Sequence, residues 1–473
     1  MKDTALAQPG TLWDCDMGTG KTRPAIDLWE ELGRPKTIIT APLSVVRGVW
    51  IDEFEKWRRK DLPPPRIGIV DSRIKARRGL TAAEHRIKVA RESDVVITNY
   101  DLVWRKPFSD ALLRMGFELL IMDEIHRIKA PGGTTSRYLS RLGDRVPKRV
   151  GLTGTPMPHS PLDIYAQFRA LDKNVFGTSN ALFKARYAIM GGYERHQVVG
   201  YQNEDELKSR FERIAVQVRA DDVLTLPDSV DSTRSFELTP KAIKLYREAE
   251  REFYIQLEQG YITVANALVK LLRLQQITSG YLIPDDAEDP LTIDDGKRGV
   301  LKDILSDSGD THVVVFCRFT YDVQAAKQVA SDVGMTAWEF SGHVKQLDEW
   351  RDAGGVLAVQ IQSGGLGIDL TKARTGIYYS LGFSLGDYLQ SRARILRPGQ
   401  TRKVHYIHIL GDTCNPKVKG DSIDFTVMRA LEKRQQVIES IIYRSGRGPD
   451  ITQTLMAEAT GDALSMFFDG ERT

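Results

Sequence analysis

The 473-residue sequence lacks several features that would place it in a specialised class of protein. It has only three cysteines, Cys15, Cys317 and Cys414, which form no CxxC pair and no metal-ligand cluster, so a reducing compartment fits best. No apolar run of about 18 residues occurs, so no membrane span is predicted. The first residues, MKDTALAQPG, lack the charged start and apolar core of a secretory signal. We therefore expect a cytoplasmic protein without membrane contact.

Net charge and repetitive sequence are also nearly absent. The formal charge is +3, from 66 basic and 63 acidic residues, so only local patches can point to a nucleic-acid partner. There is no Pro-, Ser- or Gln-rich tract and no repeat of fixed period. The hydrophobic content of 41% is ordinary for a globular protein. At roughly 100–200 residues per domain, the length predicts two to four domains.

A glycine-rich stretch, DCDMGTGKTR, occupies residues 14–23. The run before it, TLWDC, is typical of a short strand, and the run after it, RPAIDLWEEL, has apolar residues at near-helical spacing. A loop that joins a strand to a helix is the context expected of a phosphate-binding P-loop. Gly18, Thr19 and Gly20 would form the cradle, because glycine lets backbone N–H groups approach phosphates closely.

The residues that end this loop complete the pattern. Lys21 would reach the β- and γ-phosphates of a nucleotide, and Thr22 would ligate Mg²⁺. One departure is present, because Cys15 stands where the pattern GxxxxGK[ST] begins with Gly. The alternative interpretation is a chance GxGKT.

A second segment, FELLIMDEIHRIK at residues 117–129, can supply the acidic partner of the loop. Its apolar run is long enough for a buried parallel strand, which would deliver Asp123 and Glu124 at the edge where open α/β sheets bind ligands. Asp123 would hold Mg²⁺ through water, and Glu124 would act as the general base. We group His126 with them as a residue that couples the site to a second domain. The alternative is that the acidic residues cap a helix.

A third segment, RVGLTGTPMPHSPLDIYAQF, follows at residues 149–168. It predicts a strand, a Thr-Gly-Thr-Pro turn and a helix. Thr153 and Thr155 place two hydroxyl groups on the turn, where they would sense the nucleotide state. We assign them to coupling.

These motifs, DMGTGKT, DEIH and LTGTP in this order, resemble those of superfamily II helicases and translocases, and more narrowly the Swi/Snf-type DNA translocases. Four further stretches support the narrower resemblance: TIITAPLSVVRGVWIDEFEKW (37–57), DVVITNYDLV (94–103), VRADDVLTLPD (218–228) and LVKLLRLQQITSGYL (268–282). The resemblance implies an α/β fold with two RecA-like parallel-sheet lobes in tandem and helical insertions between them. It also implies ATP and Mg²⁺ as cofactors.

We divide the chain on this basis into four parts. Residues 1–172 form the first lobe, 173–295 form helical protrusions and the linker, 296–445 form the second lobe, and 446–473 form a tail. In the second lobe, VLAVQIQSGGLGIDLTKA predicts a strand with a glycine-rich exit. There we assign Gly367 and Asp369 to cofactor binding, although the family usually has Asn at position 369.

The segment DYLQSRARILRPGQ, at residues 387–400, resembles the family's Q-x-x-x-R-x-x-R block. Gln390 is assigned to coupling. Arg394 and Arg397 are three residues apart, so we expect them on one helical face, from which they would act as arginine fingers on the γ-phosphate. The alternative is a solvated basic face.

Contacts to a nucleic-acid backbone are expected from the loops that follow three strands. The residues assigned to these contacts are Ser44, Asn99, Tyr100, Ser363 and Gly364. The densest basic runs are KWRRK, at residues 56–60, and the span 73–91, for which a solvated helix face is the alternative.

Two absences qualify the resemblance. The family has a Gln-containing, adenine-reading helix some 20–40 residues before the P-loop, whereas only 17 residues precede Gly18 here and none matches well. Adenine selectivity is then weak, or the pocket is built otherwise, or the true start lies upstream. No appended reader module is visible, which indicates a minimal motor from a virus or a bacterium, acting in the cytoplasm of a bacterial or virus-infected cell.

The predicted function is an ATP-dependent translocase that tracks double-stranded DNA through sequence-independent backbone contacts. Alternatives are a strand-separating DNA or RNA helicase, the motor subunit of a restriction or defence complex, and a non-catalytic nucleic-acid clamp with a vestigial ATP site. Protein partners are not predicted, and the oligomeric state is left open, with a monomer as one option.

Overall fold

A computed structural model describes residues 1–43, 45–77, 79–191, 197–258, 264–283, 289–364, 368–414 and 422–438. The chain forms two compact units. The first comprises residues 1–224 together with the last described residues, 437 and 438, and the second comprises residues 225–436. The predicted tail at 446–473 lies outside the described residues. Among those residues, no helix is both long and apolar enough to cross a membrane.

Unit 1 is built on a seven-stranded parallel sheet of order β3-β4-β2-β5-β6-β1-β9. Its strands are β1 (Gly10–Cys15), β2 (Thr37–Ala41), β3 (Ile67–Val70), β4 (Val95–Asn99), β5 (Leu119–Asp123), β6 (Lys148–Thr153) and β9 (Ala215–Val218). Strands β1, β2 and β4 are buried along their whole length, as expected where helices cover both faces of a parallel sheet.

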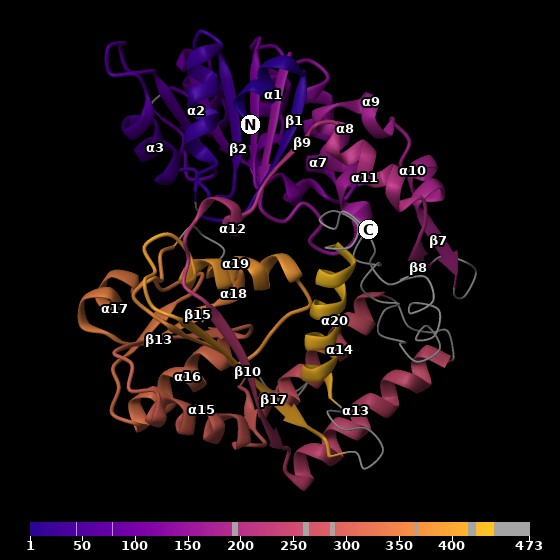
Figure 1. Cartoon of the computed structure of the whole chain (residues 1–473), viewed down its shortest axis with the longest axis vertical. Coiled ribbons are helices and arrows are strands. Elements are labelled where there is room, and N and C mark those ends of the chain that lie inside the picture. The colour runs from indigo at the N-terminus through magenta and orange to yellow at the C-terminus, as the bar shows by residue number, and fades with distance from the viewer. Residues whose placement is uncertain are drawn as a thin grey trace. The chain divides into compact units, whose positions relative to one another are not determined.

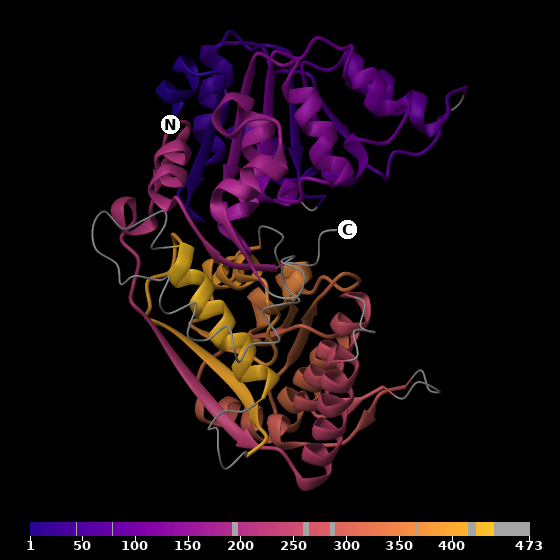
Figure 2. The same cartoon turned by 90° about the vertical axis from the view of Figure 1, so that its right-hand side faces the viewer.

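Helices cover both faces of this sheet (Figures 1 and 2). They are α1 (Lys2–Ala7), α2 (Thr22–Glu31), α3 (Val49–Trp57), α4 (Ala82–Glu92), α5 (Tyr100–Val103), α6 (Phe108–Leu112), α7 (Thr134–Gly143) and α8 (Ile164–Leu171), with short 3₁₀ turns η1 (Ile125–Ile128) and η2 (Pro161–Asp163). The short helix α12 (Ala220–Val223) follows β9 and has no buried residue. On one face, Trp29 of α2 and Trp50 of α3 pack against alternate strand residues such as Trp13 and Ile39. This core fixes the start of α2, and therefore the loop before it.

A small helical extension follows α8. It contains α9 (Lys173–Phe176), α10 (Asn180–Tyr187), the antiparallel pair β7 (Ala188–Gly191) and β8 (Gln197–Tyr201), and α11 (Glu204–Glu212). Aromatic rings hold the extension to α8, because Phe168 lies 5.0 Å from Phe176 and 5.5 Å from Phe211 between ring centroids. The chain then returns to the sheet as β9, which pairs with β1.

Unit 2 contains a six-stranded parallel sheet of order β10-β17-β16-β13-β15-β14. Its strands are β10 (Ser229–Glu237), β13 (His312–Cys317), β14 (Ala337–Phe340), β15 (Gly355–Gln360), β16 (Thr375–Tyr378) and β17 (Val404–Asp412). A second, antiparallel pair joins β11 (Tyr281–Leu282) to β12 (Leu291–Thr292).

The helices of unit 2 are α13 (Pro240–Glu258), α14 (Val264–Thr278), α15 (Gly296–Asp307), α16 (Thr320–Asp332), α17 (Leu347–Ala353), α18 (Ile361–Gly364), α19 (Leu385–Ile395) and α20 (Ile423–Ile438). Residues of α15 and α16, including Leu301, Val323 and Ala326, pack on the buried strands β13 and β15. The predicted α/β architecture with two RecA-like parallel-sheet lobes is confirmed.

The sequence-based outline differs from the structure in the middle of the chain. The segment 173–295, predicted as mainly helical, lies on both sides of the division at residue 224. It also supplies the edge strand β9 to the first sheet and the edge strand β10 to the second. Neither strand has a continuous apolar run, because an edge strand has only one neighbour and β10 is largely exposed.

Candidate nucleotide site

The glycine-rich loop joins β1 to α2, as the sequence predicts. Gly18 and Gly20 have φ values of 84° and 83°, a left-handed backbone that residues with a side chain rarely adopt. Thr22 is the first residue of α2, so the loop ends at a helix N-terminus, where N–H groups and the helix dipole favour an anion. The local geometry fits a phosphate group.

Lys21 is bound by the loop itself in this structure. Its Nζ atom donates to the carbonyl oxygen of Cys15 at 2.7 Å and lies 3.4 Å from that of Asp16. The Thr19 hydroxyl also donates to the Asp16 carbonyl, at 2.7 Å. The ammonium group therefore stays at the loop, positioned for a short move toward a bound phosphate.

Asp123 and Glu124 come at the end of β5, two strands away from β1 in the sheet. The indole N–H of Trp50 donates to Asp123 Oδ2 at 3.0 Å. Burial, followed by the neighbouring charge of Glu124, raises the pKa of Asp123 to about 6, while Trp50 and Lys21 oppose that rise. A divalent cation would restore the ionised form, because a nearby positive charge lowers the pKa of a carboxyl group.

A chain of contacts links the second motif to the third. His126 Nδ1 lies 3.3 Å from Glu124 Oε2 and 3.0 Å from the Thr153 hydroxyl, which accepts from the Thr155 N–H at 3.0 Å. Glu124 itself has a left-handed backbone, φ 54° and ψ 54°, which is uncommon outside glycine. The structure therefore brings together all five residues predicted from these two motifs, Asp123 included.

Gly154 brings the third motif against the P-loop. A Cβ atom at this position would lie 3.0 Å from the Cys15 carbonyl oxygen and 3.5 Å from Lys21 Nζ. Strand β6, which carries this turn, lies between β1 and β5. The three motifs thus meet at one edge of the sheet, and the donor set of Thr22, Asp123 and Glu124 beside Lys21 fits a Mg²⁺–nucleotide complex.

In unit 2, hydrogen bonds link both predicted arginines to the residues on either side of Asp369. The N–H of Leu370 donates to the Arg394 carbonyl at 3.0 Å, and Arg397 Nη1 donates to the Ile368 carbonyl at 3.3 Å. Burial alone would raise the pKa of Asp369, but hydrogen bonds from Thr371 and the charge of Arg397 lower it overall. Asp369 is therefore held as an anion next to the arginine segment.

The prediction that Arg394 and Arg397 share one helical face is wrong. Helix α19 ends at Ile395, so Arg394 is helical and Arg397 lies beyond the helix end. The cause is Pro398, because the residue before a proline is disfavoured in the helical conformation. Gln390 is in α19 and 7% exposed.

The predicted nucleic-acid contacts are placed less clearly. Asn99 and Tyr100 are buried, 2% and 5% exposed, and the Tyr100 hydroxyl donates to the Asp123 carbonyl at 2.8 Å. Ser363 and Gly364 are the last residues of α18. Ser44 and the cofactor residue Gly367 lie outside the described residues. These assignments remain predictions.

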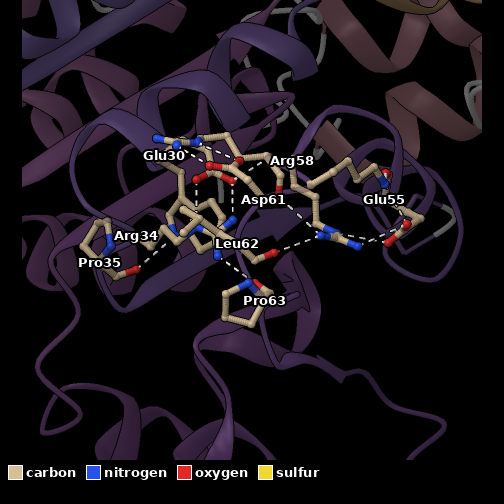
Figure 3. A network of polar contacts seen from close by, with 11 residues as sticks. Glu30, Arg34, Pro35, Glu55, Arg58, Asp61, Leu62 and Pro63 are labelled. Carbon is tan, nitrogen blue, oxygen red and sulfur yellow. Dashed lines mark hydrogen bonds and ion pairs between the residues drawn. The ribbon is translucent and has the colours of Figure 1, made fainter.

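The basic run KWRRK is largely neutralised by acidic neighbours. Arg58 and Lys60 both pair with Glu55, at 3.1 and 2.7 Å, and Arg59 pairs with Asp61 at 2.5 Å. Figure 3 shows this network continuing to Arg34 and Glu30 at the end of α2. The run ties α2 to the end of α3, which favours the solvated-face alternative over a nucleic-acid contact.

Two residues of this site carried no role in the sequence analysis. Trp50 lies in the stretch 37–57 and Arg219 in the stretch 218–228, which support the family resemblance without indicating a role for either residue. Arg219 forms ion pairs with Asp14 at 2.6 Å and with Asp16 at 3.0 Å, on either side of Cys15. The partners of these two residues cannot be predicted from the stretches themselves, because they are far away in the sequence and come close only when the sheet forms.

Comparison with known families decides what this arrangement represents. The model of the SNF2-related domain matches residues 5–280, more than half of the chain, and that of the helicase conserved C-terminal domain matches residues 296–399. The chain belongs to the SNF2 family. The resemblance to Swi/Snf-type translocases is thereby confirmed, and members of this family are DNA-dependent ATPases.

Individual SNF2-type relatives are distant. "Putative protein p41" of Acyrthosiphon pisum secondary endosymbiont phage 1 is 26% identical, over 90% of this chain and 93% of its own length. The human "DNA annealing helicase and endonuclease ZRANB3" is 25% identical over 90% of this chain, which spans 38% of the length of that relative. The solved "Sulfolobus solfataricus SWI2/SNF2 ATPase core in complex with dsDNA" matches with a TM-score of 0.41 and 20% identity, over 94% of this chain and 95% of that one.

Proposed function

We propose that this SNF2-family chain hydrolyses ATP with Mg²⁺ and uses the energy to move along double-stranded DNA. One observation carries the proposal. Within unit 1, the P-loop lysine, the Asp123–Glu124 pair and the Thr-Gly-Thr turn meet at the ends of three neighbouring strands and contact one another. A vestigial site would have no need to keep this set together.

The roles of the unit 1 residues follow from their chemistry. With a nucleotide bound, Lys21 would exchange the Cys15 carbonyl for the β- and γ-phosphates, and Thr22 and Asp123 would hold the cation. Glu124 orients a water molecule and accepts its proton. His126 lies between the Glu124 carboxylate and the Thr153 hydroxyl, so one imidazole connects the base to the turn. Bound Mg²⁺ supplies positive charge that offsets the charge developing on the phosphates.

The arginines of unit 2 provide the remaining charge. We assign Arg394 and Arg397 to the γ-phosphate, where guanidinium groups stabilise the transition state of phosphoryl transfer. Arg397 follows the end of α19 and precedes Pro398. Its backbone carbonyl accepts from the Gln400 N–H, and its guanidinium donates to the Ile368 carbonyl. The two arginines are therefore positioned separately and not as one helical surface.

The choice of DNA as the track draws on relatives. The human relative is by name a DNA annealing helicase and endonuclease, and this chain spans 38% of its length. The phage relative supports our proposal that the protein acts in the cytoplasm of a bacterium or of a virus-infected cell. Contacts to phosphates alone would make movement independent of sequence.

The test is the steady-state ATPase rate with no nucleic acid, with duplex DNA, with single-stranded DNA and with RNA, with Lys21→Ala as the blank. Stimulation by duplex DNA supports the proposal, and displacement of a third strand from a DNA triplex would show movement. Stimulation by single strands or RNA alone would replace it with the helicase alternative. No turnover under any condition would leave a nucleotide-binding clamp.

A further inference from the structure

The stretch that connects the two units, residues 219–231, is anchored at both of its ends. Arg219 follows β9 in unit 1, and Asp231 lies in β10 of unit 2. Between α12 and β10 the chain has five residues, 224–228, without regular structure. Pro227 stiffens this part, because proline fixes its own φ and keeps the preceding residue extended. The connection is thus short and stiff.

The first anchor is on the P-loop. Arg219 binds Asp14 and Asp16 with separate nitrogens, and the backbone N–H of Ala220 donates to Asp16 Oδ2 at 2.9 Å. Asp14 has no exposed surface and also accepts from Gln217 Nε2 at 3.1 Å. Four donors from residues 217–220 therefore hold the two acidic residues with which the loop begins.

Asp16 connects this anchor to the nucleotide-binding residues. Its side chain is held by Arg219 and Ala220, while its carbonyl oxygen accepts from Thr19 and lies within 3.4 Å of Lys21 Nζ. When Lys21 moves to a phosphate, the carbonyl group of Asp16 loses one of its donors. Because the Asp16 side chain is bound by Arg219, a rotation of the Asp16 peptide would disturb this ion pair.

The second anchor is on the arginine helix. Arg392 of α19 makes a bidentate ion pair with Asp231, in which the Nη2–Oδ2 distance is 2.8 Å. The guanidinium group also lies 4.0 Å from the centroid of the Tyr406 ring and 3.0 Å from the Tyr388 hydroxyl. Burial alone would raise the pKa of Asp231, but Arg392 outweighs burial and lowers it. Arg392 precedes Arg394 by two residues on the same helix.

We propose that Arg219 and Asp231 are positioning residues, which make the connection between the units a tether that links the state of the P-loop to the position of the arginine helix. This inference rests on the proposed ATPase function. Neither residue touches the reacting atoms, and each acts through a neighbour: Arg219 through Asp16, and Asp231 through Arg392. If each ion pair only stabilised its own unit, substitutions at Arg219 and Asp231 would affect turnover independently. If the two residues form a tether, a substitution at either one removes the same coupling.

The experiment is a double-mutant cycle on DNA-stimulated turnover. Arg219→Lys keeps the charge but cannot bind both carboxylates as a fork does, and Asp231→Asn removes the charge with little change in size. We expect each variant to lower the DNA-stimulated kcat roughly 10-fold, and the double variant to lose about the same factor, since coupled sites are not additive. Asp231→Asn should leave the KM for ATP within about threefold. A double variant that loses the product of the two factors would overturn the proposal.

The matched control is Arg169→Ala. Arg169 also makes a bidentate pair, with Asp144 at 3.1 and 2.8 Å, and its side chain is 20% exposed against 24% for Arg219. It lies in α8, whose last residue contacts Gly10 at the opposite end of β1 from the loop. Arg169→Ala should leave turnover unchanged and combine additively with Asp231→Asn.

A second readout does not depend on turnover. Hydrogen exchange of residues 14–22 reports the P-loop directly, and the tether predicts that Asp231→Asn, in the other unit, speeds it. Unchanged exchange there would overturn the inference even in an active enzyme. A wild-type protein that DNA does not stimulate would instead refute the proposed function, and the exchange measurement would still test the tether.

Discussion

Removing the indole N–H of Trp50 should change the metal dependence of the enzyme. Trp50 is fully buried and donates to Asp123 Oδ2 at 3.0 Å. Trp50→Phe keeps an aromatic ring in the core but removes the donor. A hydrogen bond to a charged group contributes about 1.5–3 kcal/mol, and one pKa unit corresponds to about 1.4 kcal/mol. The pKa of Asp123, about 6 in the wild type, should therefore rise by at least about one unit.

The sign of the effect is fixed by which form the indole stabilises. It stabilises the carboxylate, so without it Asp123 is protonated over a wider range and binds Mg²⁺ less well at pH 7. The acidic limb of the kcat/KM profile should move up by about one unit, and excess Mg²⁺ or pH 8.5 should restore most of the rate. The pKa of Asp123 is higher in the folded protein than in the unfolded chain, so its contribution to the free energy of unfolding is present at low pH and is lost as the pH rises through about 6. In Trp50→Phe the same loss should occur at a higher pH.

The control is Trp29→Phe in the same core. The Trp29 indole donates to a carbonyl oxygen, that of Pro35 at 3.0 Å, and not to a carboxylate. Both variants should lower the melting temperature by a similar amount, about 2–4 °C per kcal/mol lost for a unit of this size. Only Trp50→Phe should shift the Mg²⁺ requirement and the acidic limb. Equal shifts in the two variants, or none in either, would refute the reasoning.

Three further outcomes are expected. Glu124→Gln should bind ATP but turn it over at least roughly 100-fold more slowly, measured as single-turnover phosphate release, and near-normal release would remove Glu124 as the base. Arg397→Ala should keep nucleotide affinity, measured by fluorescent ADP, and lose DNA-stimulated turnover; a loss of affinity alone would make it a binding residue. Lys297→Met should lower the free energy of unfolding of unit 2, measured in urea, by about 3–5 kcal/mol. Asp424 lies 2.8 Å from Lys297 Nζ and would become an uncompensated buried charge. A loss below about 1 kcal/mol would contradict this.

The parts of the site that local sequence determines were predictable. A strand, a glycine loop and a helix follow one another within 22 residues of Gly10, so their order and spacing fix the P-loop without tertiary information. The same holds for β5 with Asp123 and Glu124, because a short apolar run buried on both faces has few alternatives.

Two interpretations of sequence patterns in the site were changed by residues next to the pattern. The i, i+3 spacing of Arg394 and Arg397 indicates one helical face, but Pro398 ends the helix first. The run KWRRK has the composition of a nucleic-acid contact, but its acidic partners, Glu55 and Asp61, flank it in the same turn region. In both cases the residues that decide the outcome are present in the sequence. The spacing of the arginines and the basic composition of the run nevertheless favour the other interpretation.

The environment of each carboxylate, and not its position in a motif, decides which one can bind a cation. Asp14 and Asp123 both stand at the end of a parallel strand. Asp14 is fully buried, and its Oδ2 atom is paired with the charge of Arg219 and accepts from the Gln217 amide, so a cation at Oδ2 would have to displace the anchor. Asp123 accepts from a neutral indole and, among the described residues, forms no ion pair like that of Asp14 with Arg219. Burial, followed by the charge of Glu124, raises its pKa, so a positive charge is the stabilising addition. The same reasoning assigns Arg219 to the tether and Lys21 to nucleotide binding. The Arg219 guanidinium is already paired with two carboxylates, whereas the Lys21 ammonium group is bound by carbonyl oxygens that a phosphate can replace.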